Sequence, residues 1–89
     1  MRESEIGREI RSLAQLSRGN QGVIHAIHGA ANESKRLLIM GLRPGSAFTL
    51  LLGPDRRGVV LDSAGTRIAL GREWLDQIQV RQPSAAAKG

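Results

Sequence analysis

The stretch KRLLIMGLRPG, residues 35–45, contains the strongest local signals for a helix and a turn in this chain. Leu37 and Met40 lie three residues apart, which is the spacing of one helical face. Asn32 upstream is a residue type that often caps a helix N-terminus. We therefore expect a helix from about Glu33 to Met40, with Leu37 and Met40 packed against the rest of the domain.

The second half of this stretch makes the chain turn. Gly41 occupies the position after a helix at which the backbone commonly adopts positive φ. Pro44 and Gly45 form a turn that keeps the helix from resuming. Leu42, between these two breaks, is expected to insert into the core behind the helix.

Short apolar segments separated by turn residues lie on both sides of the helix. Alternating and β-branched side chains predict strands, and the glycine-containing stretches between them predict turns. The predicted strands are Val23 to Ile27, Phe48 to Leu52 (with Phe48, Leu50 and Leu52 on one apolar face), Gly58 to Asp62, Arg67 to Leu70 and Ile78 to Val80. The predicted turns are Gly53-Pro54-Asp55 and Ala64-Gly65-Thr66, and a helical turn is expected from Arg72 to Gln77.

This order of elements predicts a mainly β domain of about five short strands, with one inserted α-helix and a short C-terminal helical turn. Partial closure into a small barrel is expected, because it removes exposed strand edges. The domain is expected to span residues 13–80. Residues 1–12 are interpreted as an N-terminal extension. Ile6 and Ile10 of this extension and Leu13, the first residue of the domain, have the spacing of a helical face. Residues 81–89 are expected to form a disordered tail.

The composition excludes several classes of protein. The chain has 89 residues and no cysteine, so one domain is expected, and disulfides, thiolate metal sites and cysteine nucleophiles are excluded. No apolar run approaches the ~20 residues that span a bilayer. The charged N-terminus lacks a signal-peptide pattern, and a cytoplasmic protein is expected.

The charge of the chain leaves several kinds of partner open. A net charge of +5 can attract nucleic acid, an anionic membrane face or an acidic protein surface. The cations are scattered, with only Lys35-Arg36 and Arg56-Arg57 adjacent, which is typical of a solvated surface. The only aromatic residues are Phe48 and Trp74, which argues against a protein that stacks nucleic-acid bases.

No residue pattern predicts catalysis or metal binding. His25 and His28, the only histidines, lie three apart on a predicted strand, so their side chains are expected to point to opposite faces. An iron site instead needs converging ligands. Neither a Gly-x-Ser-x-Gly elbow nor a phosphate-binding glycine loop with a lysine is present. We expect a protein that is not an enzyme and has no cofactor or metal site.

Six segments in order resemble the FeoA family of small SH3-like barrels, which is associated with bacterial ferrous iron uptake. These segments are LAQL at 13–16 leading to Gly19, GVI at 22–24 with Ile27, KRLLIMGLRPG at 35–45, Gly53-Pro54, GTRIAL at 65–70 and IQV at 78–80. The resemblance implies an SH3-like barrel whose structural motif comprises Leu37, Gly41, Leu42, Pro44 and Gly45. Ser63 departs from the family, which more usually has an apolar residue there, so this strand is expected to be frayed or edge-like.

The resemblance also implies a function. It predicts a cytoplasmic adaptor that docks onto an FeoB-type membrane iron transporter, which carries a cytosolic G-protein domain, and modulates it. Contact with the membrane is then at most peripheral, through that partner. We expect the partner-binding surface on the helix and the following turn, at Arg36, Ile39, Met40 and Arg43.

Two other functions are kept as alternatives. One is a small basic barrel that binds nucleic acid, with Arg56 and Arg57 on an exposed turn. The other is a free-standing SH3-like module similar to the C-terminal domain of metal-dependent repressors, which also docks onto protein. Self-association is left open by the sequence.

Overall fold

The structure, a computed structural model, describes residues 9–82. These residues form a six-stranded antiparallel sheet in the order β1-β6-β2-β3-β4-β5, together with one α-helix and two 3-10 turns. The elements along the chain are β1 (Glu9–Ser12), η1 (Leu13–Gln15), β2 (Gln21–Ile27), α1 (Ala31–Ile39), β3 (Ala47–Asp55), β4 (Gly58–Ser63), β5 (Thr66–Leu70), η2 (Arg72–Trp74) and β6 (Ile78–Gln82). The predicted mainly β fold with one inserted helix is confirmed.

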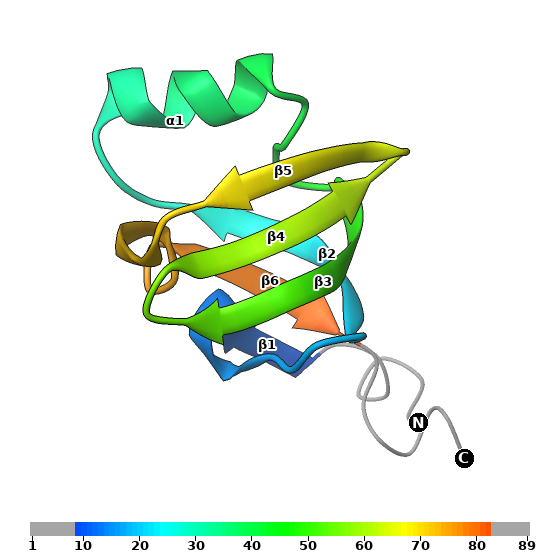
Figure 1. Cartoon of the computed structure of the whole chain (residues 1–89). Helices are drawn as coiled ribbons and strands as arrows, with labels where there is room; N and C mark the ends of the chain where they lie inside the picture. Colours follow the sequence, from blue (N-terminus) through cyan, green and yellow to red (C-terminus); the bar gives the residue numbers. More distant parts are fainter. Residues whose placement is uncertain (1–8, 83–89) are drawn as a thin grey trace.

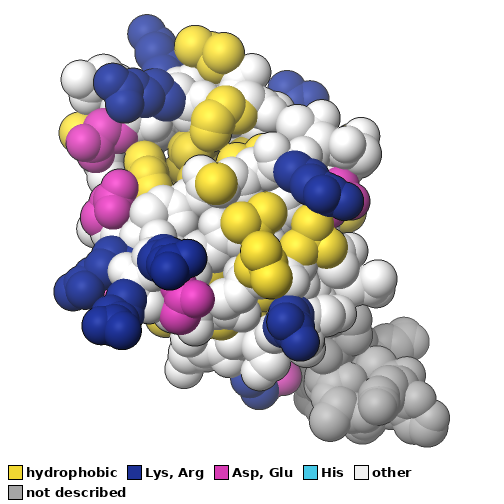
Figure 2. All heavy atoms as spheres, viewed as in Figure 1, with side chains coloured by type: hydrophobic (Ala, Val, Ile, Leu, Met, Phe, Trp, Pro, Cys, Tyr) yellow, Lys and Arg dark blue, Asp and Glu magenta, His cyan; other side chains and the backbone are white. Residues whose placement is uncertain are grey.

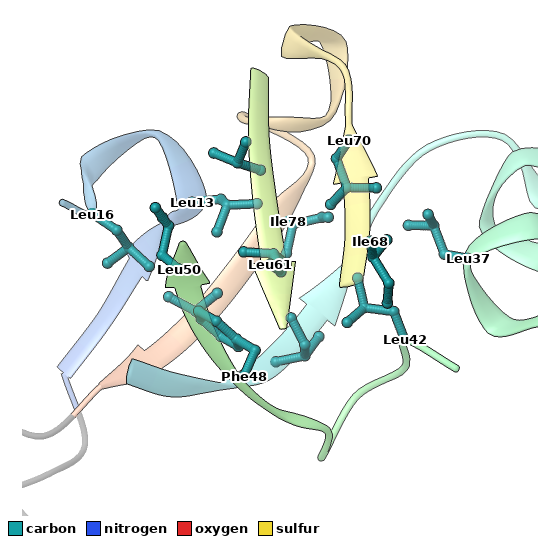
Figure 3. Close-up of a cluster of buried hydrophobic side chains, with 13 residues drawn as sticks. Leu13, Leu16, Leu37, Leu42, Phe48, Leu50, Leu61, Ile68, Leu70 and Ile78 are labelled. Carbon is teal, nitrogen blue, oxygen red and sulfur yellow. The ribbon is translucent and has the colours of Figure 1, made fainter. Parts of the chain in front are cut away.

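The sheet curls so that β3, β4 and β5 face β1, β2 and β6, and α1 lies outside the sheet beside β5 (Figure 1). Apolar side chains from both layers fill the space between them (Figure 3). Ile78 and Val80 of β6 and Leu50 of β3 have no exposed surface, as their alternation predicts. Each such large side chain contributes about 1.5–3 kcal/mol on burial, so this shared core holds the two layers together.

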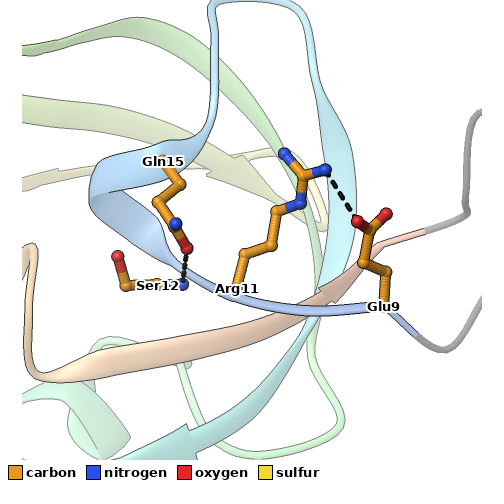
Figure 4. Close-up of polar contacts among 4 residues, drawn as sticks. All are labelled: Glu9, Arg11, Ser12 and Gln15. Atoms are coloured by element: carbon orange, nitrogen blue, oxygen red, sulfur yellow. Dashed lines mark hydrogen bonds and ion pairs between the residues drawn. The ribbon is translucent and has the colours of Figure 1, made fainter.

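Strand β1 was not predicted, and the expected helical face is wrong for Ile10 and Leu13. Residues Glu9–Ser12 pair antiparallel with β6 and bring the sheet to six strands, before the predicted domain start at residue 13. Ile10 is 46% exposed, whereas Leu13 is fully buried. Glu9 and Arg11, two residues apart and thus on one face of the strand, form an ion pair of 2.7 Å (Figure 4).

Strand β1 ends at Ser12, where η1 begins, and the side chain of Gln15 bonds to the backbone at this junction. Ser12 is still paired with Gln79 of β6, and its backbone N–H donates to Gln15 Oε1 at 2.9 Å, which links the end of the strand to η1 (Figure 4). At the other end of the domain, β6 continues through Arg81 and Gln82, beyond the predicted end at residue 80. The rest of the expected tail and Ile6 lie outside the described residues.

Strand β3 differs from its predicted pattern in its second half. Phe48 and Leu50 are buried, but Leu52 is 54% exposed, so the expected common face is wrong for Leu52. The pairing of β3 with β4 shifts between Leu50↔Leu61 and Leu52↔Val60. A bulge that inserts one residue reverses the alternation of side chains and thereby turns Leu52 outward.

The turn expected at Gly53-Pro54-Asp55 lies further along the chain. These three residues belong to β3, and the chain reverses at Arg56 and Arg57, between the paired residues Asp55 and Gly58. Asp55 Oδ1 accepts a hydrogen bond of 2.8 Å from the Arg57 backbone N–H. This local bond is the aspartate turn chemistry that places the reversal after Asp55.

Ser63 is neither frayed nor at a sheet edge, so that expectation is wrong. Strand β4 pairs with β3 on one side and β5 on the other, and Ser63 is 8% exposed. Its hydroxyl donates to the Ala47 carbonyl oxygen at 2.8 Å. The hydrogen bond allows a polar side chain to occupy this buried position.

Candidate protein-docking surface

The C-terminus of α1 is held by a glycine-based cap. Gly41 has φ +97° and donates its N–H to the Leu38 carbonyl at 2.9 Å, and Leu42 donates to the Leu37 carbonyl at 2.9 Å. These two bonds form a Schellman motif, in which the residue after the glycine contacts the last helical turn. Leu37 and Leu42 are accordingly 2% and 0% exposed, which confirms their predicted place in the core.

The N-terminus of α1 differs from the prediction. The helix begins at Ala31 instead of about Glu33, and its N-cap is Ala30, which offers no side-chain hydrogen bond. Asn32 is therefore inside the first turn and is not the cap. The Ser34 hydroxyl donates to the Ala30 carbonyl at 3.2 Å, which supplies no acceptor for the N–H groups of the first turn.

The turn after α1 is tied to β2. Ile24 donates its N–H to the Ser46 carbonyl at 2.9 Å, and Gly45 donates to the Ile24 carbonyl at 2.8 Å. The Ser46 hydroxyl accepts from the Arg43 N–H at 3.2 Å and donates to the Gly41 carbonyl at 3.3 Å. Arg43 therefore sits in a turn that is fixed to the sheet on one side and to the helix on the other.

Three consecutive apolar side chains at the end of α1 face solvent. Ile39 is 83% exposed, Leu38 50% and Met40 40%, the largest such run in residues 9–82. The expectation that Met40 packs beside Leu37 in the core is wrong. Met40 is the C-cap residue, where the chain already leaves the helix, so its side chain does not follow the face of Leu37.

Cations surround this apolar run. We call the apolar run and these cations together the helix surface, which comprises Lys35, Arg36, Leu38, Ile39, Met40 and Arg43. All six side chains are exposed, so Arg36, Ile39, Met40 and Arg43 lie where a partner can reach them. Within residues 9–82 the only ion pair joins Glu9 and Arg11, and Arg36 and Arg43 thus have no carboxylate partner there. Apolar and basic side chains gather at the end of the molecule that α1 occupies (Figure 2).

A shallow apolar groove of about 340 Å³ borders the helix surface. It lies between α1, the turn after α1 and the end of β2, and its lining includes Ile27, Ala31, Lys35, Leu38, Arg43 and Pro44. Sequence reasoning missed Leu38 and Lys35. The helix phase could have found both, because an inward Leu37 places residues 31, 35 and 38 together on an adjacent face.

The other predicted positions do not converge on a site. His25 and His28 are both exposed, and residues 9–82 contain no group of three His, Asp or Glu side chains that could hold a metal ion. His28 Nε2 lies 3.5 Å from Gln79 Oε1, an ordinary surface contact. Arg56 and Arg57 are exposed at the tip of the β3–β4 hairpin, as expected for a solvated turn.

Comparison with known proteins identifies the family of this chain. The FeoA domain model matches residues 11–82. A crystal structure of an iron uptake regulatory protein, FeoA, is 26% identical with a TM-score of 0.75 and covers 83% of this chain and 99% of its own. No curated protein matches the chain by sequence.

Two further structures share the fold at lower identity. The FeoA protein from Chlorobium tepidum is 18% identical, with a TM-score of 0.73, covering 83% of this chain and 71% of its own. A manganese-dependent transcriptional repressor is 17% identical, with a TM-score of 0.76, covering 84% of this chain and 42% of its own. In the part of this chain that the structure describes, no helix has the length and apolarity needed to cross a membrane. The predicted SH3-like fold and the resemblance are confirmed, and the chain belongs to the FeoA domain family.

Proposed function

We propose that this chain is an accessory protein of bacterial ferrous iron uptake that docks onto an FeoB-type membrane iron transporter and modulates it. Membership of the FeoA family and the similarity to an iron uptake regulatory protein support the link to iron uptake. The proposed role is non-enzymatic and is exercised at the cytoplasmic side of the membrane. Docking onto the FeoB-type transporter and modulation of its activity go beyond this family relationship and are our proposal.

The observation that carries the docking proposal is the helix surface. Ile39 is 83% exposed, and burying such a side chain against a partner contributes about 1.5–3 kcal/mol. Arg36 and Arg43 flank it, and a guanidinium pairs with a carboxylate through two parallel hydrogen bonds. A partner that offers an apolar pocket beside carboxylates complements both features.

The helix surface is also well positioned for recognition. The Schellman cap and the bonds from Ser46 fix Arg43 relative to α1, so little conformational freedom of the backbone is lost on binding. Interface residues that carry most of the binding energy are enriched in arginine. We therefore assign the main binding contribution to Arg36 and Arg43, with Ile39 and Met40 between them.

Capture of the detergent-solubilised transporter by the immobilised chain tests this proposal. Arg36→Ala combined with Arg43→Ala should weaken capture at least about thirtyfold, because even one truncation at such a site costs about 2 kcal/mol or more. Both side chains are exposed, so the melting temperature should stay unchanged. The matched control is Arg67→Ala with Arg72→Ala, two exposed arginines that belong neither to α1 nor to the turn after it, which should keep capture.

Two results contradict the proposal. One is an absence of transporter capture by the unaltered chain. The other is RNA binding that falls steeply with salt and is weakened by Arg56→Ala with Arg57→Ala, since counterion release then identifies a nucleic-acid site at the hairpin tip.

A further inference from the structure

A second apolar surface lies on the outer side of the β3–β4–β5 layer. Leu52 is paired with Val60, and Val60 is paired with Ala69, so the three side chains form a row across three strands. The row exists because the β3 bulge turns Leu52 outward. Apolar side chains cross the middle of this face, and basic side chains lie around them (Figure 2).

The row lines a hollow. Leu52, Val60 and Ala69 border a concavity of about 490 Å³, between the β3–β4 hairpin and the end of β5. Leu52 is 54% exposed and Val60 is half-buried. The hollow is thus open to solvent and lined in part by apolar side chains, and it suits protruding side chains supplied by a partner.

Two arginines line the same hollow. Arg18 comes from the loop before β2 and Arg57 from the tip of the β3–β4 hairpin, and both are exposed. Neither pairs with a carboxylate in the described part of the chain. Asp55 also borders the hollow, but its Oδ1 is used to accept the Arg57 backbone N–H. The hollow is therefore apolar at its centre and positively charged in sum.

We propose that this hollow, formed by Leu52, Val60, Ala69, Arg18 and Arg57, is a second docking site that binds a leucine-bearing acidic peptide segment of a partner protein. An apolar side chain of the segment fills the hollow over Leu52 and Val60. Neighbouring carboxylates of the segment pair with Arg18 and Arg57, whose planar forks suit carboxylates.

The surface fits other occupants less well. Insertion into a bilayer needs apolar side chains that form a convex surface, whereas this row lines a concavity. Nucleic-acid strands use aromatic platforms, and none lines the hollow. A second copy of the chain brings the same excess of arginine, and a net charge of +5 repels it.

The hollow is independent of the helix surface, because none of its lining residues belongs to α1 or to the turn that follows it. A partner that contacts both sites gains avidity, since the second contact becomes intramolecular. A negative result for peptide binding at the hollow therefore leaves transporter capture by the helix surface to be measured separately.

The test is a titration of the isotope-labelled chain with the synthetic peptide acetyl-EELLEELLEELL-amide, followed by amide chemical shifts. We expect the largest shifts at Leu52, Arg57, Val60 and Ala69. A peptide with lysine in place of every glutamate, and one with serine in place of every leucine, should bind at least about tenfold more weakly.

Variants test whether the peptide binds in the hollow. Leu52→Ser should weaken the peptide's affinity at least about tenfold, because it removes a large apolar contact from an exposed position without disturbing the core. The matched control, Ile10→Ser, removes an apolar side chain that is 46% exposed but lies on β1, outside the lining of both surfaces, and it should leave the affinity unchanged. Arg18→Glu with Arg57→Glu should reverse the preference from the acidic peptide to the lysine peptide.

Several outcomes overturn the inference. They are an absence of shifts at millimolar acidic peptide, shifts confined to α1, retained affinity in Leu52→Ser, and equal binding of the acidic and lysine peptides. Co-sedimentation with anionic phosphatidylglycerol vesicles that Leu52→Ser abolishes, without peptide binding, identifies a membrane site and also overturns it.

Discussion

Gly58 shows how a single residue allows the β3–β4 hairpin to pack closely against the end of β5. It has φ +118° and begins β4, and a Cβ at this position overlaps the Leu70 carbonyl oxygen of β5. The collision is with backbone, which cannot rotate away as a side chain can. Only glycine therefore allows the hairpin and the end of β5 to approach this closely.

We expect Gly58→Ala to lower the free energy of unfolding by about 3 kcal/mol or more, because it adds a collision to the strain of positive φ. Chemical denaturation measures the loss. The matched control is Gly65→Ala, at φ +85° in the β4–β5 turn, where a Cβ meets nothing within 4 Å. That change should cost only about 1–2 kcal/mol, the strain alone. Equal losses in the two variants contradict this account of Gly58.

The positions of the two histidines lead to a prediction about ferrous iron binding. His25 and His28 are exposed and share no cluster of metal ligands in the described chain, and the whole sequence has no cysteine. We expect anaerobic calorimetry with ferrous iron to show no tight intrinsic site. One stoichiometric, submicromolar binding event that His25→Ala abolishes is the opposite outcome. A role in iron transport does not require this module to hold iron.

Residue positions could be predicted from sequence where their structure depends on near neighbours. The Schellman cap at Gly41 needs only bonds to Leu37 and Leu38, so the placement of Leu37 and Leu42 follows from the local pattern. Leu52 could not be predicted, because its outward direction depends on the register of β3 against β4. Ser63 is buried through a bond to Ala47, sixteen residues away, which no local pattern reveals.

At the scale of elements, α1 illustrates how one helix serves both the core and the surface. It reaches the core through Leu37 at 2% exposure, while Ile39, two residues further on, is 83% exposed. Since the two side chains point in different directions around the helix axis, substitutions at the two positions should have separable effects.

We expect Leu37→Ala to destabilise the domain by about 2–5 kcal/mol, because it leaves a cavity beneath the helix. Ile39→Ala should change stability by no more than about 0.5 kcal/mol, since the side chain is already in water. Thermal melts of both variants provide the comparison. A similar destabilisation in the two proteins contradicts the assigned orientation of α1.

Strand β1 shows the limit of element prediction. The spacing of Ile10 and Leu13 fits a helical face. Glu9–Ser12 nevertheless forms a strand, because it pairs with the backbone of β6, which would otherwise be a free sheet edge. That partner lies at the other end of the chain, so its influence is absent from any local window. The existence of α1 was predictable because its periodicity and its glycine cap are local, but its first turn began earlier than the capping pattern indicated.

At the scale of the whole molecule, the two proposed sites lie on different parts of one small domain. The helix surface is built on α1 and the turn tied to β2, and the hollow is built on β3, β4 and β5. In the helix surface, the exposure of Arg36 and Ile39 was predictable from the phase of the helix, whereas Lys35 and Leu38 were missed. The hollow was not predictable, since it exists only through a bulge and a three-strand register.

Uptake of radiolabelled ferrous iron by cells measures whether docking through the helix surface modulates transport. Cells that retain the transporter but lack this chain are complemented with the unaltered chain, with Arg36→Ala and Arg43→Ala together, or with the control pair Arg67→Ala and Arg72→Ala. We predict that loss of the chain changes the uptake rate and that the unaltered chain and the control pair restore it. The helix-surface variant, expressed at an equal level, should fail to restore it. Full restoration by that variant, or an uptake rate that does not depend on the chain at all, contradicts the account.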